Sequence, residues 1–429
     1  MCLLSAFTIQ FTKASFFPYL EDSINALLAE HIGALQSYHD SIRAEALICL
    51  EQLVGVAVAQ HGPNDTPLRG VCIQLHPVVQ EMCKVSLSTY INVMCEDCEK
   101  EPVARACEGV AAILQRVGVV ALTITTDDKK RMIDPLMQMV SQLIHEKANC
   151  QTATQYEHHE GDEDDDHDSI VMDSVCDLIG TFAKCMGSEF IPYFDQFLKP
   201  LLKFTKPSRL HSDRAMVIGC FAEVVGELGS VSVKYADGLL PVIKAGLADE
   251  MEGVRRNSAY CVGTLVEATE TALSPHVLPL LQCLHPLCIR PAHQQGSDMG
   301  GADVDNAIAA VARIIKAMPT VAPIAQVLPV LVANLPFRVD FEECEHVYGM
   351  LAGLIQQNDP TILHSLLPQV LTLFADTLSS SKYNDASKAV VRSCVQSMVQ
   401  NPDIRTLFVN AVNQVNDPNV KQILEQAAN

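Results

Sequence analysis

The sequence predicts an all-α fold, a solenoid in which antiparallel helix pairs stack side by side. Leu, Val, Ala and Ile dominate the 429 residues, Trp is absent, and aromatic residues make up only 5%, which favours helix-on-helix packing over a sheet. Apolar residues recur at helical spacing, as in Val217, Phe221, Val224 and Leu228. One pair cannot bury its own apolar stripe, so we expect stacking into a right-handed superhelix whose concave face is lined by second helices.

The repeating unit joins an apolar helix marked by Pro to a second helix that opens near Arg, Asn and Ala. The copy at residues 239–270 has Pro241 in its first helix, an acidic turn at Asp249, and a second helix that begins at Val254. In the copy at residues 190–229, AMVIGCFAE aligns without gaps on AYCVGTLVE. The unit has the length of a two-helix HEAT repeat.

Further copies follow the same pattern and are centred on Pro18 to Gly62, Pro77 to Gly118, Pro135 to Gly187, Pro279 to Met318, Pro329 to Asn358 and Pro368 to Asn401. We expect residues 1–429 to form a HEAT-repeat array of about eight to nine units, each of roughly 40–60 residues. Residues 402–429 are expected to add a pair of C-terminal capping helices.

Two insertions interrupt the array. Residues 151–168 are too polar to join a core, so we expect disorder there. This segment is either a solvated loop without function or a segment whose negative charge attracts Lys- and Arg-rich partners. Its acidic residues are Glu157, Glu160, Asp162, Glu163, Asp164, Asp165, Asp166 and Asp168. Residues 290–303 are rich in Gly, which predicts a flexible connection between helices.

The formal net charge of −21 restricts the class of partner. Nucleic-acid binding needs a basic stripe, because phosphate contacts supply most of the affinity. None is apparent, so we expect no direct nucleic-acid contact and instead a cationic partner. The sixteen cysteines follow no framework spacing, which indicates reduced thiols in an intracellular protein. MCLLSAFTIQ lacks the basic flank of a signal peptide, and no apolar run of about eighteen residues predicts a membrane span.

No pattern indicates catalysis, a metal or a cofactor. Cys95 and Cys98 form a lone CEDC, which lacks the second ligand pair of a structural zinc site. His158, His159 and His167 lie in the acidic insertion, which offers no fixed geometry. Gly-rich phosphate loops, G-x-S-x-G and H-E-x-x-H do not occur. We therefore expect a binding protein and not an enzyme.

The polar faces of the second helices carry the candidate binding residues. Carboxylates, an amide oxygen and a Tyr ring suit an ammonium group through ion pairs, hydrogen bonds and cation–π contact. We expect stacking to bring them into one groove for a Lys-rich peptide: Glu223, Glu227, Asn257, Tyr260, Glu267, Asp303, Asp305, Asn306, Glu342, Glu343 and Glu345. The alternative is structural, because acids in a first turn meet the helix dipole favourably and Asn can brace the next repeat's backbone.

Several segments together resemble the karyopherin-beta (importin-beta) family of nuclear transport receptors, and within it the importin-4 branch. They are the copies at 190–270 with DEMEGVRRNSAYCVGTLVE, the insertion EGDEDDDHD, DVDNAIAAVARII at 303–315 and LPFRVDFEECEHVYGMLAGLI at 335–355. The resemblance implies shuttling between cytoplasm and nucleus, contact with FG nucleoporins, import of basic cargo and release by RanGTP. For this branch it implies core histones (histones three and four) and ribosomal proteins as cargo.

Family members are much longer, and their Ran-binding arch is N-terminal. This chain begins inside an apolar helix, so we expect the C-terminal half of a longer, monomeric receptor. A competing class is a structural HEAT scaffold of a multiprotein complex, of the phosphatase type, which would bind folded partners through the turns inside its repeats. The acidic insertion and the rows of acid, Asn and Tyr favour a receptor for extended basic peptides.

Overall fold

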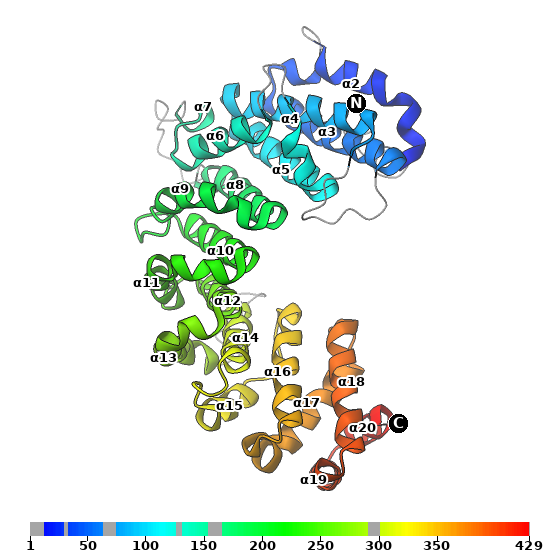
Figure 1. Cartoon of the computed structure of the whole chain (residues 1–429), viewed down its shortest axis with the longest axis vertical. Coiled ribbons are helices and arrows are strands. Elements are labelled where there is room, and N and C mark those ends of the chain that lie inside the picture. The colour runs from blue at the N-terminus through cyan, green and yellow to red at the C-terminus, as the bar shows by residue number, and fades with distance from the viewer. Residues whose placement is uncertain are drawn as a thin grey trace. The chain divides into compact units, whose positions relative to one another are not determined.

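Helices make up nearly all of the described chain in this computed structural model, which describes residues 13–29, 33–62, 74–125, 131–152, 165–290 and 301–428. Within those ranges there is no strand, only an isolated bridge between Thr125 and Arg131. The chain divides into two compact units, Met1–Leu228 and Gly229–Asn429. Each unit is a stack of helix pairs (Figure 1).

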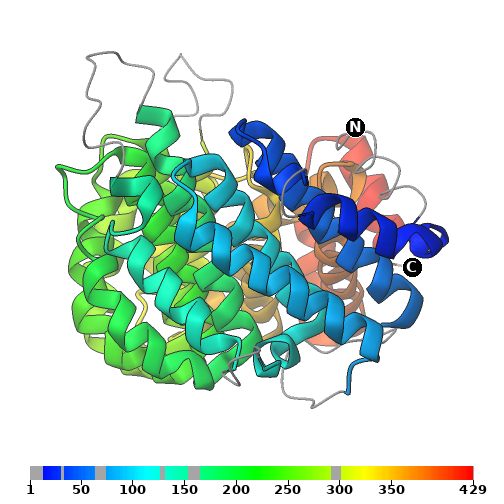
Figure 2. The ribbon, with the colours of Figure 1, turned by 90° about the horizontal axis from the view of Figure 1, so that it is seen from above.

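The first unit contains four successive pairs among its described residues. Their helices are α2 (Leu20–Leu28) with α3 (Asp40–His61), α4 (Pro77–Glu96) with α5 (Lys100–Val117), α6 (Ile133–Ile144) with α8 (Asp165–Met186), and α9 (Ile191–Leu201) with α10 (His211–Leu228). A short helix, α7 (Asn149–Thr152), precedes α8. The second helices pack in order, α3 on α5, α5 on α8 and α8 on α10, and Figure 2 shows this layering from above.

The second unit continues the pattern with five described pairs. They are α11 (Ala236–Leu247) with α12 (Glu252–Thr269), α13 (Val277–Cys288) with α14 (Ala302–Ala317), α15 (Ile324–Ala333) with α16 (Cys344–Gln356), α17 (Leu367–Ser379) with α18 (Asp385–Gln400), and α19 (Pro402–Gln414) with α20 (Pro418–Ala428). Here too the second helices stack, α12 on α14, α14 on α16 and α16 on α18. The predicted all-α HEAT solenoid is confirmed.

Both predicted insertions are shorter than expected. α7 runs to Thr152 and α8 begins at Asp165, so residues 165–168 belong to a helix and not to a loop. Residues 153–164, which include Glu157 to Asp164, lie outside the described residues. In the second insertion α14 begins at Ala302, and residues 291–300 lie outside the described part.

The second helices carry the core. Val217, Phe221 and Val224 of α10 are fully buried, as their spacing predicts. α14 is buried on all sides over residues 302–315, because α12, α13 and α16 all pack on it. Its alanines at 307, 309, 310 and 312 are nearly inaccessible, and such small side chains let neighbouring helices approach closely.

Cysteines serve mainly as small apolar core residues. Every described cysteine is a free thiol, and most lie on buried helix faces. Burial raises the pKa of Cys83, Cys288 and Cys394 to about 12 each, so these side chains stay neutral at physiological pH. A neutral buried thiol is a packing group and not a nucleophile.

Among the residues that the structure describes, two stretches, Lys100–Thr123 and His211–Leu247, are long and apolar enough by composition to cross a membrane. In α5, however, Val103, Val110 and Ile113 are fully buried against other helices. Core helices of a stacked helical protein have the same composition as membrane spans, so these stretches are weak evidence for a membrane segment.

A glycine fixes the packing of the second pair in the first unit. Tyr90 of α4 is fully buried, and its hydroxyl donates a hydrogen bond of 3.2 Å to the carbonyl oxygen of Leu47 on α3. A Cβ at Gly109 of α5 would overlap the Tyr90 ring. Gly109 therefore lets three helices meet around one aromatic side chain.

We expect Gly109→Ala to destabilise the first unit by about 1–3 kcal/mol, because the added methyl group overpacks a rigid, buried ring. Gly226→Ala on α10 is the matched control, since a Cβ there would meet nothing within 4 Å. The control should be neutral or stabilising by about 0.5–1 kcal/mol, from helix propensity alone. Urea denaturation followed by circular dichroism measures both, and equal stabilities would contradict the packing role of Gly109.

Candidate functional site

Asp303, a predicted groove residue, lies inside a contact between repeats. Its Oδ2 accepts hydrogen bonds from Arg255 Nε at 2.7 Å and from Arg290 Nη1 at 2.9 Å. The side chains of Asp303 and Arg255 are only 3% and 8% exposed. The carboxylate thus joins the start of α14 to α12, and peptide cargo could reach it only by breaking this pair.

Asp305 and Asn306 hold the turn that precedes α16. Asp305 accepts backbone hydrogen bonds from Arg338, Val339 and Asp340 at 2.8–3.1 Å. Burial raises the pKa of Asp305, and the three backbone N–H groups oppose that rise. Asn306 Nδ2 donates to the Ala302 carbonyl oxygen at 2.9 Å and to Asp340 Oδ2 at 2.8 Å. Both residues brace one repeat against the next.

Arg313 of α14 occupies the cluster predicted to surround a cargo lysine. Its guanidinium donates to Glu343 Oε2 at 2.8 Å and lies 3.4 Å from Glu267 Oε2, and its Cζ is 5.3 Å from the Tyr260 ring centroid. Burial raises the pKa of Glu343, an effect that Arg313 opposes. Burial by itself would raise the pKa of Glu267, but the hydrogen bond with His346 and the charge of Arg313 outweigh burial and lower that pKa below its ordinary value.

The prediction that these residues form one cargo groove therefore needs correction. Asp303, Asp305, Asn306 and Glu343 are at most 7% exposed, and we assign them to inter-repeat contacts, which is the structural alternative. The remaining candidates differ in exposure: Glu223, Glu342 and Glu345 are exposed, whereas Glu227, Asn257, Tyr260 and Glu267 are half-buried. Residue spacing identified the polar helix faces but not which of them the neighbouring repeat covers.

A row of carboxylates on the second helices of the first unit was missed in the sequence, apart from Glu223. We call it the acidic face and define it as Glu108 of α5, Asp173 and Asp177 of α8, and Glu223 of α10. Partial burial raises the pKa of Asp173, Asp177 and Glu223, and like charge within the row raises each further. The spacing of Asp173 and Asp177, one helical turn apart, was the available signal.

Few cations offset the acidic face. Arg105 donates a hydrogen bond of 2.8 Å to Glu108. The charge of Lys184 opposes the rise in the pKa of Glu223, but the net shift is still upward. Carboxylates that repel one another favour an incoming cation.

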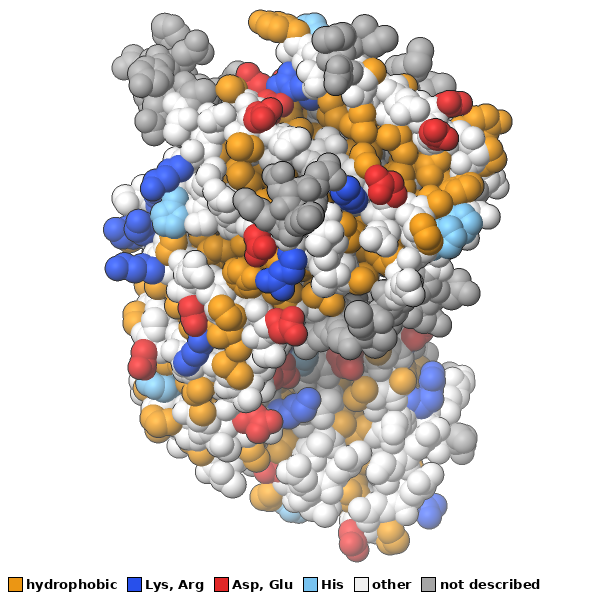
Figure 3. Space-filling view, turned by 45° about the horizontal axis from the view of Figure 1, so that its top comes forward, with side chains coloured by type: hydrophobic (Ala, Val, Ile, Leu, Met, Phe, Trp, Pro, Cys, Tyr) orange, Lys and Arg blue, Asp and Glu red, His pale blue; other side chains and the backbone are white. Residues whose placement is uncertain are grey.

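On the face that Figure 3 draws, basic side chains form a small group at one edge and otherwise intermingle with acidic and apolar ones.

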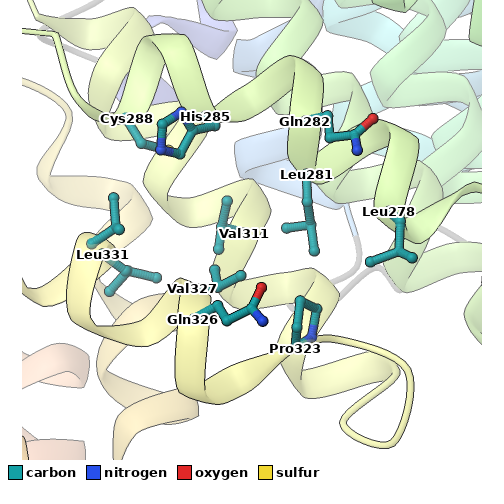
Figure 4. Close-up of a pocket in the computed structure, with 11 residues that line it drawn as sticks. Leu278, Leu281, Gln282, His285, Cys288, Val311, Pro323, Gln326, Val327 and Leu331 are labelled. Atoms are coloured by element: carbon teal, nitrogen blue, oxygen red, sulfur yellow. The ribbon is translucent and has the colours of Figure 1, made fainter.

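An apolar cleft lies between first helices of the second unit (Figure 4). Leu278 and Leu281 of α13 face Pro323 and Val327 at the start of α15, with Val311 of α14 between them. Amides of Gln282 and Gln326 rim the cleft, whose volume is about 440 Å³. Leu278 is 53% exposed, so a partner's side chain can reach the cleft. Residue pattern could not predict this cleft, because its walls lie some forty-five residues apart in the chain.

In the described part of the chain, no group of three or more His, Cys, Asp or Glu side chains is arranged to hold a metal ion. Cys95 and Cys98 are exposed, and the Cys98 thiol lies 3.9 Å from the Glu96 carbonyl oxygen. His158 and His159 lie outside the described residues.

We expect Asp303→Ala to destabilise the second unit by about 3–5 kcal/mol, because it strands the buried Arg255 charge. Glu345→Ala, an exposed acid on α16, should change stability by no more than about 0.5 kcal/mol. Guanidinium denaturation compares the two. Equal stabilities would mean that Asp303 is not a brace and would return it to the list of cargo contacts.

Comparisons with known proteins agree with the resemblance in the sequence. A family model described as importin repeat 6 matches residues 127–207. The probable importin subunit beta-4 of Schizosaccharomyces pombe is 28% identical over 238 residues, which cover 55% of this chain and 22% of that protein. Human importin-4 is 24% identical over 385 residues, which cover 89% of this chain and 33% of that protein. The chain thus spans between a fifth and a third of these relatives' length.

Solved structures of Kap121p share the fold. The crystal structure of that karyopherin with the SUMO protease Ulp1p has a TM-score of 0.70 at 15% identity and covers 97% of this chain and 36% of that one. The complex with RanGTP has a TM-score of 0.68 at 14% identity and covers 99% and 36%. The importin-repeat match and the curated relatives together support the resemblance to the karyopherin-beta family, with similarity to importin-4 over most of this chain's length.

Proposed function

We propose that this chain acts in nuclear import, as the part of a transport receptor that binds basic, Lys- and Arg-rich cargo. The acidic face carries the proposal, because like charges lie close together along it and few cations oppose them. Exposed carboxylates attract a cationic segment over a long range and give fast, salt-dependent association. An extended segment can follow successive second helices along an open stack.

Core histones three and four and ribosomal proteins are the cargo classes that the importin-4 similarity suggests. Their basic segments match the acidic face in charge. Shuttling between cytoplasm and nucleus follows from the same proposal, as does a role without catalysis, cofactor or membrane. The acidic residues of the segment 151–168 would add attraction for the same cargo.

A second contact, with nucleoporins, is favoured by the apolar cleft between α13 and α15. Kap121p has been crystallised with Nup53p and with RanGTP, and we propose corresponding partners for the longer receptor. A Phe side chain of an FG nucleoporin would bury its ring against Leu281 and Val327, while the rim amides of Gln282 and Gln326 could bond its backbone. Burial of aromatic surface in such a cleft is the usual source of affinity for short motifs.

A structural scaffold of the phosphatase type is the competing function. It would bind folded partners through the turns inside repeats and would not discriminate between basic and neutral peptides. The acidic face favours the receptor, because partial burial and like charge oppose ionisation at Asp173, Asp177 and Glu223 and a scaffold would gain nothing from such a row.

We expect a histone-tail-like Lys-rich peptide to bind the wild-type protein with marked salt dependence, and Asp173→Lys with Asp177→Lys to weaken binding by about tenfold or more. Glu342→Lys with Glu345→Lys is the matched control, because it makes the same change in charge at exposed positions of the second unit. Fluorescence anisotropy at two salt concentrations measures all three proteins. Equal weakening by both double variants would place the attraction outside the acidic face, with residues 151–168 as the next candidate.

The same peptide should lose affinity as the pH falls. The pKa values of Asp173, Asp177 and Glu223 are raised in the folded protein, so these groups take up protons at a higher pH than ordinary carboxyls, whose pKa is about 4. Protonation removes the charge that attracts lysine, while lysine itself stays charged. Titrations from pH 7 downward should show affinity falling before free carboxyls titrate, and a constant affinity would exclude the acidic face.

A further inference from the structure

A short basic run interrupts this acidic chain at the end of α9. Residues 196–212 contain Lys199, Lys203, Lys206 and Arg209 and no Asp or Glu, although acidic residues outnumber Lys and Arg by 51 to 30 in the whole chain. These residues occupy the last turn of α9 and the connection to α10, at an outer edge of the first unit (Figure 1). We call the four side chains the basic patch.

The connection that carries the basic patch is held in place by its neighbours. Phe204 is only 2% exposed, and the guanidinium carbon of Arg209 lies 4.6 Å from the centroid of its ring. Arg214 of α10 donates a hydrogen bond of 3.2 Å to the carbonyl oxygen of Pro207. Because these contacts fix the connection, a partner does not have to order it on binding, and that lowers the entropic cost of association.

One carboxylate of this chain already pairs with the basic patch. Arg209 donates from Nη1 and Nη2 to the two carboxylate oxygens of Glu146, each at 2.7 Å, and the side chains are 31% and 44% exposed. The Arg209 hydrogen bonds lower the pKa of Glu146 against the effect of burial, and the charges of Arg209 and Lys203 lower it further. The basic patch therefore stabilises a carboxylate that stays in contact with solvent.

The lysines of the basic patch have no such partner. Lys199, Lys203 and Lys206 are exposed, and within the described part of the chain their ammonium groups form no hydrogen bond or close ion pair. Asp213, the next acid along the chain, is only 7% exposed, and burial raises its pKa. Asp195 lies one turn before Lys199 and has an interaction of its own. The lysines thus present positive charge to solvent.

We infer that the basic patch is an interaction surface for an Asp- or Glu-rich segment of a partner protein, whose carboxylates would pair with the lysines as Glu146 pairs with Arg209. This inference goes beyond the proposed function and does not rest on it, because basic cargo is assigned to the acidic face. Nucleic acid fits less well, since it would bring a continuous row of phosphates against a chain of net charge −21. Phe204 is also buried under Arg209 and cannot stack on a base.

The test measures binding of a fluorescent Glu-rich peptide by anisotropy, with Gln in place of every Glu in the control peptide. At an ionic strength of about 0.1 M the field of distant acids is screened beyond about 10 Å, so the Glu peptide should bind and the Gln peptide should not. Lys203→Glu with Lys206→Glu should weaken binding by about tenfold or more. Lys244→Glu with Lys316→Glu makes the same change in charge on the second unit and should weaken it by no more than about threefold.

Glu146→Gln gives a measurement in the opposite direction. It leaves Arg209 without its carboxylate, and because an exposed ion pair is weak, the freed guanidinium can bind the peptide instead. The Glu peptide should therefore bind about threefold more tightly. Glu189→Gln, at an exposed acid near the other end of α9, is the control with the same change in charge and should have a smaller effect.

Thermal unfolding shows whether the variants fold, and Lys203→Gln with Lys206→Gln repeats the comparison if the charge reversal does not. Equal weakening by the two double variants would overturn the inference. So would a single-stranded RNA that binds the basic patch more tightly than the peptide does. Binding of the Glu peptide only after a Gly/Ser linker replaces residues 153–164 would assign the patch to the chain's own acidic segment, and would also overturn it. Failure of a Lys-rich peptide to bind would contradict the proposed function and leave this inference standing.

Discussion

The packing of each second helix against the next is the contact on which the rest of the structure depends. A helix pair in this chain exposes an apolar stripe that it cannot cover by itself, so α3, α5, α8 and α10 in one unit, and α12, α14, α16 and α18 in the other, bury one another in succession. Close approach requires small residues at the contact, which the alanines of α14 and the glycines at 55, 180 and 263 supply.

The same contact decides what a charged residue can do. A charge between two stacked helices loses solvent, and it is tolerated only when an opposite charge or a set of backbone donors replaces the lost water. Asp303, Asp305 and Glu343 meet that condition within the chain. They therefore stabilise the contact between repeats and are not available to bind a partner. Asp177 and Glu223 meet the condition only in part, because like charges raise the pKa of both and Lys184 opposes that rise at Glu223 alone. Such carboxylates retain solvent access and can attract a partner's positive charge.

Residue pattern alone could predict the helix pairs, because prolines, acidic turns and apolar spacing are local signals. It could not predict that Asp303 and Asn306 are buried between repeats, since whether a helix face is covered depends on a repeat some forty residues away. The composition of DVDNAIAAVARII did contain a hint, because so many small residues indicate a helix surrounded on all sides. Asp173 and Asp177 escaped notice beside the denser acidic run before them, although their one-turn spacing on a second helix carried the same information.

Not every carboxylate of this acidic chain helps to attract a partner. The charges of Asp303 and Glu343 are balanced within a few ångströms by Arg255, Arg290 and Arg313, so the net charge of −21 comes from other acidic residues. The exposed carboxylates, with the acidic segment, are left to supply the long-range attraction, which salt screens beyond about 10 Å. Long-range charge can therefore gather many basic proteins, whereas discrimination among them must come from short-range sites where geometry is fixed.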